Sequence, residues 1–137
     1  MSVSGEFLLP VRVYIEDTDA GGIVYYVNYL KYMERGRTEL LRALGYAKTS
    51  VLDDELLFVV HSVQVKYRRP ARLDDEVVVA TRAVKIARAY VVFDQQVRRG
   101  DELLCEAEVK VACVDKAMRP APTPAPIKAS LEEYLRQ

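Results

Sequence analysis

The chain has 137 residues and is half apolar, which is enough to build one continuous core, so we expect a single domain across residues 1–137. Its 20 Lys and Arg residues balance 20 Asp and Glu residues, and no excess positive charge favours nucleic acid or an anionic membrane as a partner. No apolar run approaches the ~20 residues of a membrane span, and residues 1–10 lack the pattern of a signal peptide. We therefore expect a cytoplasmic protein.

The first predicted elements are a strand and a long helix. In residues 9–15, apolar side chains alternate with polar ones, which indicates a half-buried strand. In residues 28–44, leucines recur at helical spacing while charged side chains occupy the other faces, which predicts an amphipathic helix. We expect Asn28 to be the N-cap of this helix and Gly45 to end it.

The next part of the chain favours strands separated by turns. Period-two alternation replaces helical spacing, and turn residues interrupt it around residues 69–75 and 99–101. In the last strand, cysteines and valines share one face while charged residues share the other, so one face of the sheet is expected to meet solvent. The predicted strands are residues 57–67, 76–86, 89–98 and 102–114.

These elements predict an α+β fold. About five strands and one long amphipathic helix form a compact domain when an antiparallel sheet wraps the helix and buries its apolar stripe. A small open sheet leaves edge strands without partners, so we expect a homodimer or homotetramer.

The end of the chain combines a proline-rich segment with a short helix. Residues 119–126 contain four prolines, which cannot donate to a sheet interior, so we expect an extended surface segment. Residues 130–136 begin with Ser130 and carry Glu133 three residues later, a spacing typical of a capping box. This pattern predicts a final helix over residues 130–136.

The cysteines and the single histidine do not indicate a metal or disulfide site. Cys105 and Cys113 lie on one predicted strand, roughly 26 Å apart at ~3.3 Å per residue, which is too far for a bridge. Two separated cysteines and one histidine are too few ligands for a standard zinc site, and we expect no metal. His61 lies within a predicted strand, where a structural or surface role is expected.

The segment of residues 16–28 contains the residues best suited to chemistry. It combines three carboxylates, the pair Gly21 and Gly22, and the start of the long helix. Glycines allow close approach of a ligand, and a helix N-terminus offers free N–H groups to an oxygen that gains negative charge. A carboxylate just upstream, such as Asp19, can attack a carbonyl carbon or deprotonate a water molecule.

Two other interpretations of this segment exist. Acidic residues before a helix are often caps or dipole partners, and spacing alone leaves this alternative open. A calcium loop is a second alternative, because Asp17, Asp19 and Gly22 match three positions of the EF-hand pattern. The calcium pattern fails at Asn28, where a bidentate glutamate is required.

The same segment also resembles a known family. Residues 11–29, with the sequence VRVYIEDTDAGGIVYYVNY, are similar to the hot-dog-fold acyl-CoA thioesterases of the 4-hydroxybenzoyl-CoA thioesterase type. Within that family they most resemble the Tol-Pal-associated (YbgC-like) branch. Residues 34–39, 69–75 and 118–120 also match its motifs, so the resemblance covers nearly the whole chain.

The resemblance implies a site and a reaction. Asp19 would be the nucleophile or general base in acyl-CoA thioester hydrolysis, and the backbone N–H of Tyr26 would bind the thioester oxygen. The site would lie at a subunit interface, with no cofactor, because CoA is part of the substrate. We expect substrate contacts from Gly22, Ile23, Val24 and Asn28, and CoA contacts from Arg88, Lys66, Arg69 and Arg119.

Two questions stay open at this stage. Several members of the Tol-Pal branch have histidine where this chain has Tyr26, so the preference for aromatic or aliphatic acyl groups is not transferred. A non-catalytic module that binds acyl-CoA or acyl carrier protein is the alternative function. A hydratase of the same fold usually has a histidine beside the acid, and His61 is badly placed for that role.

Overall fold

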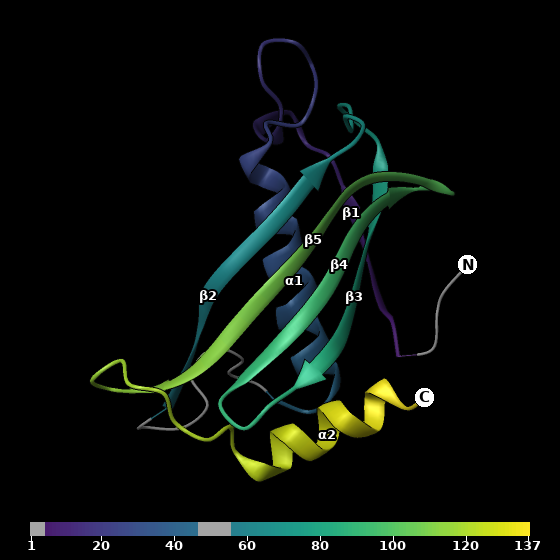
Figure 1. Ribbon diagram of the computed structural model, residues 1–137. Coiled ribbons are helices and arrows are strands. Elements are labelled where there is room, and N and C mark those ends of the chain that lie inside the picture. Colours follow the sequence, from purple (N-terminus) through teal and green to yellow (C-terminus); the bar gives the residue numbers. More distant parts are fainter. Residues whose placement is uncertain (1–4, 47–55) are drawn as a thin grey trace.

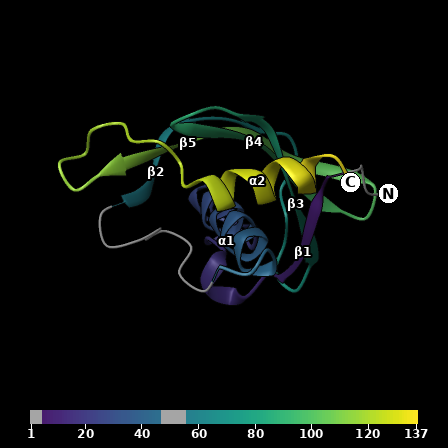
Figure 2. The same cartoon turned by 90° about the horizontal axis from the view of Figure 1, so that it is seen from below.

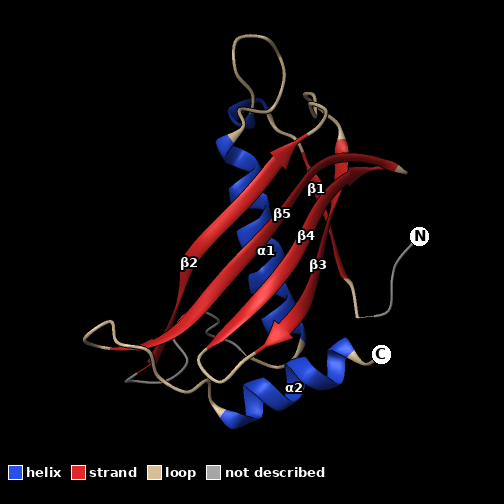
Figure 3. Cartoon of the chain, viewed as in Figure 1, coloured by secondary structure: helices blue, strands red, loops and turns tan. Residues whose placement is uncertain are grey.

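The computed structural model describes residues 5–46 and 56–137 and contains one five-stranded sheet with two α-helices (Figures 1 and 3). The strand order is β1-β3-β4-β5-β2, and every pair of neighbours is antiparallel, which confirms the predicted α+β fold. In chain order the elements are β1 (Phe7–Arg12), the 3₁₀ helix η1 (Ile15–Asp17), α1 (Val27–Ala43), β2 (Leu56–Tyr67), β3 (Glu76–Ile86), β4 (Tyr90–Arg99), β5 (Glu102–Asp115) and α2 (Ala125–Leu135).

The sheet curves over α1 and encloses its apolar side, as Figure 2 shows from below. Tyr32, Met33 and Leu40 of α1 are at most 1% exposed and meet the inward-facing side chains of β3, β4 and β5. The outer face of the sheet is polar, with Asp94 on β4 and Glu108 on β5 facing solvent. This arrangement of a helix wrapped by an antiparallel sheet confirms the expected hot-dog architecture.

A glycine allows α1 to lie close to the sheet. A Cβ atom on Gly36 would stand 2.6 Å from Thr81 Oγ1, closer than a Cβ atom approaches a neighbouring heavy atom. Gln95 fills the remaining space and is 1% exposed: its Nε2 donates to Met33 O and to Thr81 Oγ1, both at 2.8 Å. Arg37 Nη1 donates to Gln95 Oε1 at 2.8 Å, so the middle of α1 is fixed to β3 and β4 by polar contacts.

The two edges of the sheet differ. β1 is short and contains Pro10, and proline on an edge strand discourages pairing with another chain. β2 has twelve residues and contains neither proline nor glycine. Its inner-face side chains Val60, Val63 and Tyr67 are 50%, 38% and 43% exposed, although they face the helix side of the sheet. The β2 edge is therefore open and apolar.

The N-terminal strand ends earlier than predicted. β1 stops at Arg12, and the chain turns into η1, because Asp17 Oδ2 accepts the Tyr14 N–H at 2.9 Å. Ile15, expected on the buried face of the strand, is 76% exposed as a result. A side chain three residues away thus overrides the alternating pattern.

The prediction that Asn28 is the N-cap of the long helix is wrong. α1 begins at Val27, with Tyr26 at the N-cap position and no side-chain cap. Asn28 lies inside the first turn instead. The C-terminal end follows the prediction: Gly45 has a φ of +104° and comes directly after the C-cap Leu44.

The final helix starts before the predicted residue. α2 begins at Ala125 with Pro126 in its first turn, where proline fits because an N–H there has no intrahelical partner. Ser130 is inside the helix and shares a hydrogen bond with the Tyr46 hydroxyl at 3.2 Å, so it is not a cap. The segment before α2 is less exposed than expected, since Thr123 is 6% exposed and its N–H donates to Arg88 O. No helix in the described residues is long and apolar enough to cross a membrane.

Candidate active site

Asp19 lies in a tight turn that holds its carboxylate at the surface. Its N–H donates to Ile23 O at 2.9 Å, and Gly22 N–H donates to Asp19 O at 3.1 Å. Gly22 has a φ of +77°, which glycine adopts without strain. Asp19 Oδ1 accepts the Gly21 N–H at 2.8 Å, while Oδ2 has no hydrogen-bond partner within residues 5–46 and 56–137. Asp19 therefore caps its own turn rather than α1, and its second carboxylate oxygen has no hydrogen-bond partner in the described residues.

The turn is anchored to the segment between β2 and β3. Val24 is 4% exposed and its N–H donates to Ala71 O at 2.9 Å, while Ile23 forms an antiparallel bridge with Arg72. Ala71 N–H in turn donates to the Tyr29 hydroxyl at 2.9 Å, which links the segment back to α1. Residues far apart in the sequence thus hold the Asp19 turn in place.

Arg99, the last residue of β4, supports this anchor through Asp75. Arg99 Nη1 lies 2.6 Å from Asp75 Oδ2, and the same oxygen accepts the Arg72 N–H at 2.9 Å. Burial opposes ionisation of Asp75, but the hydrogen bonds from Arg72 and Arg99 outweigh it and lower the pKa of this carboxyl. The anchor therefore carries a charged pair at neutral pH.

The start of α1 leaves backbone donors free beside this turn. Tyr26 has helical angles, φ −56° and ψ −29°, and no side chain caps the helix. The Tyr25 N–H donates to Asp17 O, and the Asn28 N–H donates to Tyr25 O. In the described part of the chain, the N–H groups of Tyr26 and Val27 donate no hydrogen bond. Two unpaired donors at the positive end of a helix are suited to an oxygen that becomes negative.

Aromatic rings surround the start of α1. The Tyr26 ring is 56% exposed, and its centroid lies 5.0 Å from that of Tyr25 and 5.7 Å from that of Tyr67. Tyr29 packs against Tyr67 at 5.7 Å. Burial raises the pKa of the Tyr29 and Tyr67 phenols, so both stay neutral at physiological pH. Sequence reasoning missed Tyr67, although the alternation of residues 57–67 places it on the inner face of β2.

A mostly apolar groove of about 580 Å³ lies between α1 and β2. It begins at Val27, beside the free N–H groups, and runs past Val60 and Val63 of the open edge. Four charged residues of α1 also line it: Lys31, Glu34, Arg35 and Arg37. Its apolar lining is completed by Leu30, Met33 and Val109.

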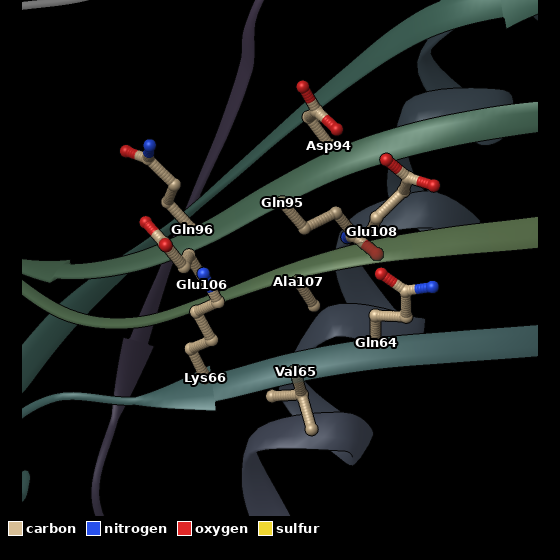
Figure 4. Close-up of a pocket in the computed structure, with 9 residues that line it drawn as sticks. All are labelled: Gln64, Val65, Lys66, Asp94, Gln95, Gln96, Glu106, Ala107 and Glu108. Carbon is tan, nitrogen blue, oxygen red and sulfur yellow. The ribbon is translucent and has the colours of Figure 1, made fainter.

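Figure 4 shows a second hollow, on the outer face of the sheet, which is lined largely by polar side chains. Lys66 lies there opposite Glu106, within a surface that also carries Asp94 and Glu108. These carboxylates oppose binding of CoA phosphates. They lie on the face of the sheet away from α1, so this hollow is separate from the groove beside Asp19.

The four expected CoA contacts fall into two groups at opposite ends of the protomer. Lys66 lies at the end of β2 and Arg69 two residues beyond that strand, whereas Arg88 O accepts the Thr123 N–H just before α2 and Arg119 lies six residues before that helix. The end of β2 and α2 lie at opposite ends of the molecule (Figure 1). Lys66 is paired with Glu106 on β5, and Arg119 is bonded to Asp115 at the end of the same strand. Glu106 and Asp115 are nine residues apart, which corresponds to about 30 Å along the strand.

Two of these arginines have carboxylate partners. Arg69 lies 3.0 Å from Glu102 and Arg119 lies 3.3 Å from Asp115, with both guanidinium groups largely exposed. The pairs are weak enough to exchange for phosphate. One protomer does not bring all four cationic side chains together.

Comparisons with known proteins agree on one family. Residues 13–131 match the model of the thioesterase-like superfamily. The chain is 44% identical to an acyl-CoA thioesterase YbgC of Haemophilus influenzae, over 90% of this chain and 93% of that one. It is 41% identical to an acyl-CoA thioester hydrolase YbgC of Escherichia coli, over 93% and 96%. A crystal structure of a probable thioesterase from Bartonella henselae superposes with a TM-score of 0.79 at 33% identity, over 87% of this chain and 98% of that one.

Proposed function

The chain belongs to the thioesterase-like superfamily, and we propose that Asp19 and the start of α1 carry out the hydrolysis of acyl-CoA to a free acid and CoA. Acyl-CoA thioester hydrolysis is the activity for which the relatives of H. influenzae and E. coli are named, and both align along nearly their whole length. The observation that carries the catalytic proposal is a free carboxylate oxygen on Asp19 beside a helix start with two unpaired N–H groups.

The proposed reaction begins at the thioester carbonyl carbon. Either the Asp19 carboxylate attacks this carbon, or it takes a proton from a water molecule that attacks. The carbonyl oxygen becomes negative and accepts hydrogen bonds from the Tyr26 and Val27 N–H groups. The C–S bond then breaks, and CoA leaves as a thiolate that takes up a proton.

The two routes differ in how the acid forms. After direct attack, water hydrolyses the acyl anhydride on Asp19 and regenerates the carboxylate; after base catalysis, the acid forms at once. Solvent oxygen enters the Asp19 carboxylate only on the direct route, when water attacks the Asp19 carbonyl of the anhydride, so label found in Asp19 after a single turnover in labelled water would establish direct attack. Neither route uses a cofactor, because CoA enters and leaves as part of the substrate.

A second copy of the chain would complete the CoA site. We propose that two β2 edges pair antiparallel about a two-fold axis, since β2 is long, open and apolar while β1 is protected by Pro10. Such pairing places the end of β2 in one subunit beside the start of β2 in the other. Because Leu56 pairs with Asp115, the partner's Arg119 region would then approach the Asp19 turn.

Sedimentation equilibrium of the intact protein tests this assembly. We expect a mass of two or four chains at micromolar concentration. A protein that stays monomeric while it hydrolyses acyl-CoA at full rate would contradict the shared site.

The catalytic proposal is tested by release of free thiol from short, long and aromatic acyl-CoAs. We expect Asp19→Asn to lower kcat/KM by about 10³-fold or more, because it removes the reacting carboxylate. Glu16→Gln is the matched control: it removes another exposed carboxylate of the same segment and should retain activity. Full activity of Asp19→Asn would refute the mechanism, and acyl-CoA that binds and returns intact would favour the non-catalytic binding module.

A further inference from the structure

One backbone oxygen connects the Asp19 turn to the start of α1. Asp17 O accepts two hydrogen bonds, one from the Tyr25 N–H at 2.9 Å and one from Asn28 Nδ2 at 2.8 Å. Asn28 is 8% exposed, and its side chain points back from the first turn of the helix toward η1. Asn28 thus joins Asp17, two residues before Asp19, to the first turn of α1, directly after the free N–H groups.

The two bonds enclose the reacting groups within one short loop. Asp17 lies two residues before Asp19, while Tyr25 and Asn28 flank Tyr26 and Val27. The Tyr25 N–H and the Asn28 side chain both donate to Asp17 O, and the two N–H groups between them donate no hydrogen bond within the described residues. The Thr18–Val24 bridge closes the same loop from the other side. The carboxylate and the donors are therefore held in one relative position.

We propose that Asn28 is a positioning residue that fixes Asp19 relative to the N–H groups of Tyr26 and Val27. This inference rests on the proposed catalytic role of Asp19. It assigns the buried side chain to the geometry of the site rather than to contact with the substrate. Removal of the Asn28 side chain leaves Asp17 O bonded to the Tyr25 N–H, so the fold loses one hydrogen bond. A misplacement of Asp19 by about 1 Å relative to the N–H donors would cost about 10²-fold in rate.

The first test is Asn28→Ala, measured by steady-state thiol release and by thermal unfolding. We expect kcat to fall by about 10- to 100-fold with KM changed less than about threefold. Ser130→Ala is the matched control, because it removes the hydrogen bond to Tyr46 at the far end of α1. It should lower Tm by a similar amount and leave kcat unchanged.

The second test is Asn28→Asp, which keeps the shape of the side chain and makes its donor depend on pH. An ionised carboxylate cannot donate to Asp17 O, whereas the protonated acid can, and burial raises the pKa of such a group. The ratio of variant to wild-type kcat should therefore rise at least about threefold from pH 8 to pH 5. For Asn28→Ala, which places no titratable group at this position, the ratio should stay flat.

The outcomes separate this inference from the catalytic proposal. Full kcat in Asn28→Ala, a loss confined to KM, or a flat pH ratio for Asn28→Asp would overturn the positioning role, while an inactive Asp19→Asn would still support the mechanism. Full activity in Asp19→Asn would instead remove the basis of both.

Discussion

The starts of α1 and α2 solve the same backbone problem in different ways. Both helices begin without a side-chain cap, so the first turn of each has N–H groups for which neither the helix nor a capping side chain supplies an acceptor. At α2 the N-cap is Pro124 and Pro126 follows in the first turn, so two of these donors do not exist. At α1 the corresponding region has Tyr26 and Val27, whose N–H groups are present and unpaired.

The surroundings of the two starts differ as well. α1 begins beside the Asp19 turn and the exposed inner face of β2, whereas α2 begins at the opposite end of the molecule (Figures 1 and 2). Orphan donors are unfavourable unless something accepts from them, and proline removes that cost at α2. The retention of donors at α1, next to a carboxylate oxygen that has no partner in the described residues, fits the reactive role that we propose for this helix start, whereas the prolines of α2 fit a structural one.

The largest effect on kcat is expected when a proline is placed at the start of α1, as at the start of α2. Tyr26→Pro removes the N–H while the φ of −56° fits proline, and Tyr25 lies outside the helix. We expect kcat to fall by about 10²- to 10³-fold, as when one oxyanion donor is removed. Thiol release from acyl-CoA measures the change, and thermal unfolding checks that the fold is retained.

Tyr26→Ala separates the N–H from the ring. It keeps the backbone donor and removes the aromatic contact with Tyr67. We expect Tyr26→Ala to retain at least about tenfold more kcat than Tyr26→Pro, since only the latter loses the hydrogen bond in the transition state. Equal kcat in the two variants would show that the ring, not the N–H, accounts for the effect of residue 26.

The smallest effect is expected when a proline in the first turn of α2 is replaced, which restores a backbone N–H donor there. Pro126→Ala restores an N–H at the first turn and makes the unfolded chain more flexible, so the free energy of unfolding should fall by about 0.5–1 kcal/mol. Activity should be unchanged, because Pro126 lies away from Asp19 of its own chain and its replacement leaves the Arg119 side chain in place. Chemical denaturation measures the first quantity and thiol release the second; a large loss of kcat would mean that the two helix starts are not independent.

Periodicity predicted most of the fold. β3 has the expected bounds, Glu76–Ile86, and the sheet wraps the helix as the burial of its apolar stripe requires. The errors have local causes: Asp17 turns the chain before Ile15, and the prolines that indicated an extended segment also start α2. Asn28 was a good candidate cap by residue type, but its side chain bonds Asp17 O instead of a helix N–H.

The candidate site was only partly contained in a local pattern. Residues 16–28 are contiguous, so glycines, carboxylates and a helix start could be recognised together. Spacing left Asp19 as either a cap or a reactant, and the structure excludes a cap of α1 because its side chain bonds Gly21. Tyr67 and Ala71 could not be placed beside this segment from the sequence, since long-range strand pairing brings them there.

The sequence by itself determined most of the elements, the family motifs and the stretch in which the candidate carboxylate Asp19 precedes a helix. These features depend on side-chain order and backbone preference within a few residues, which the chain carries wherever it folds. Only the tertiary structure decided that the Tyr26 and Val27 N–H groups stay unpaired, that β2 has an open apolar edge and that the basic residues divide between two ends. Those properties depend on which distant segments the folded sheet places next to one another.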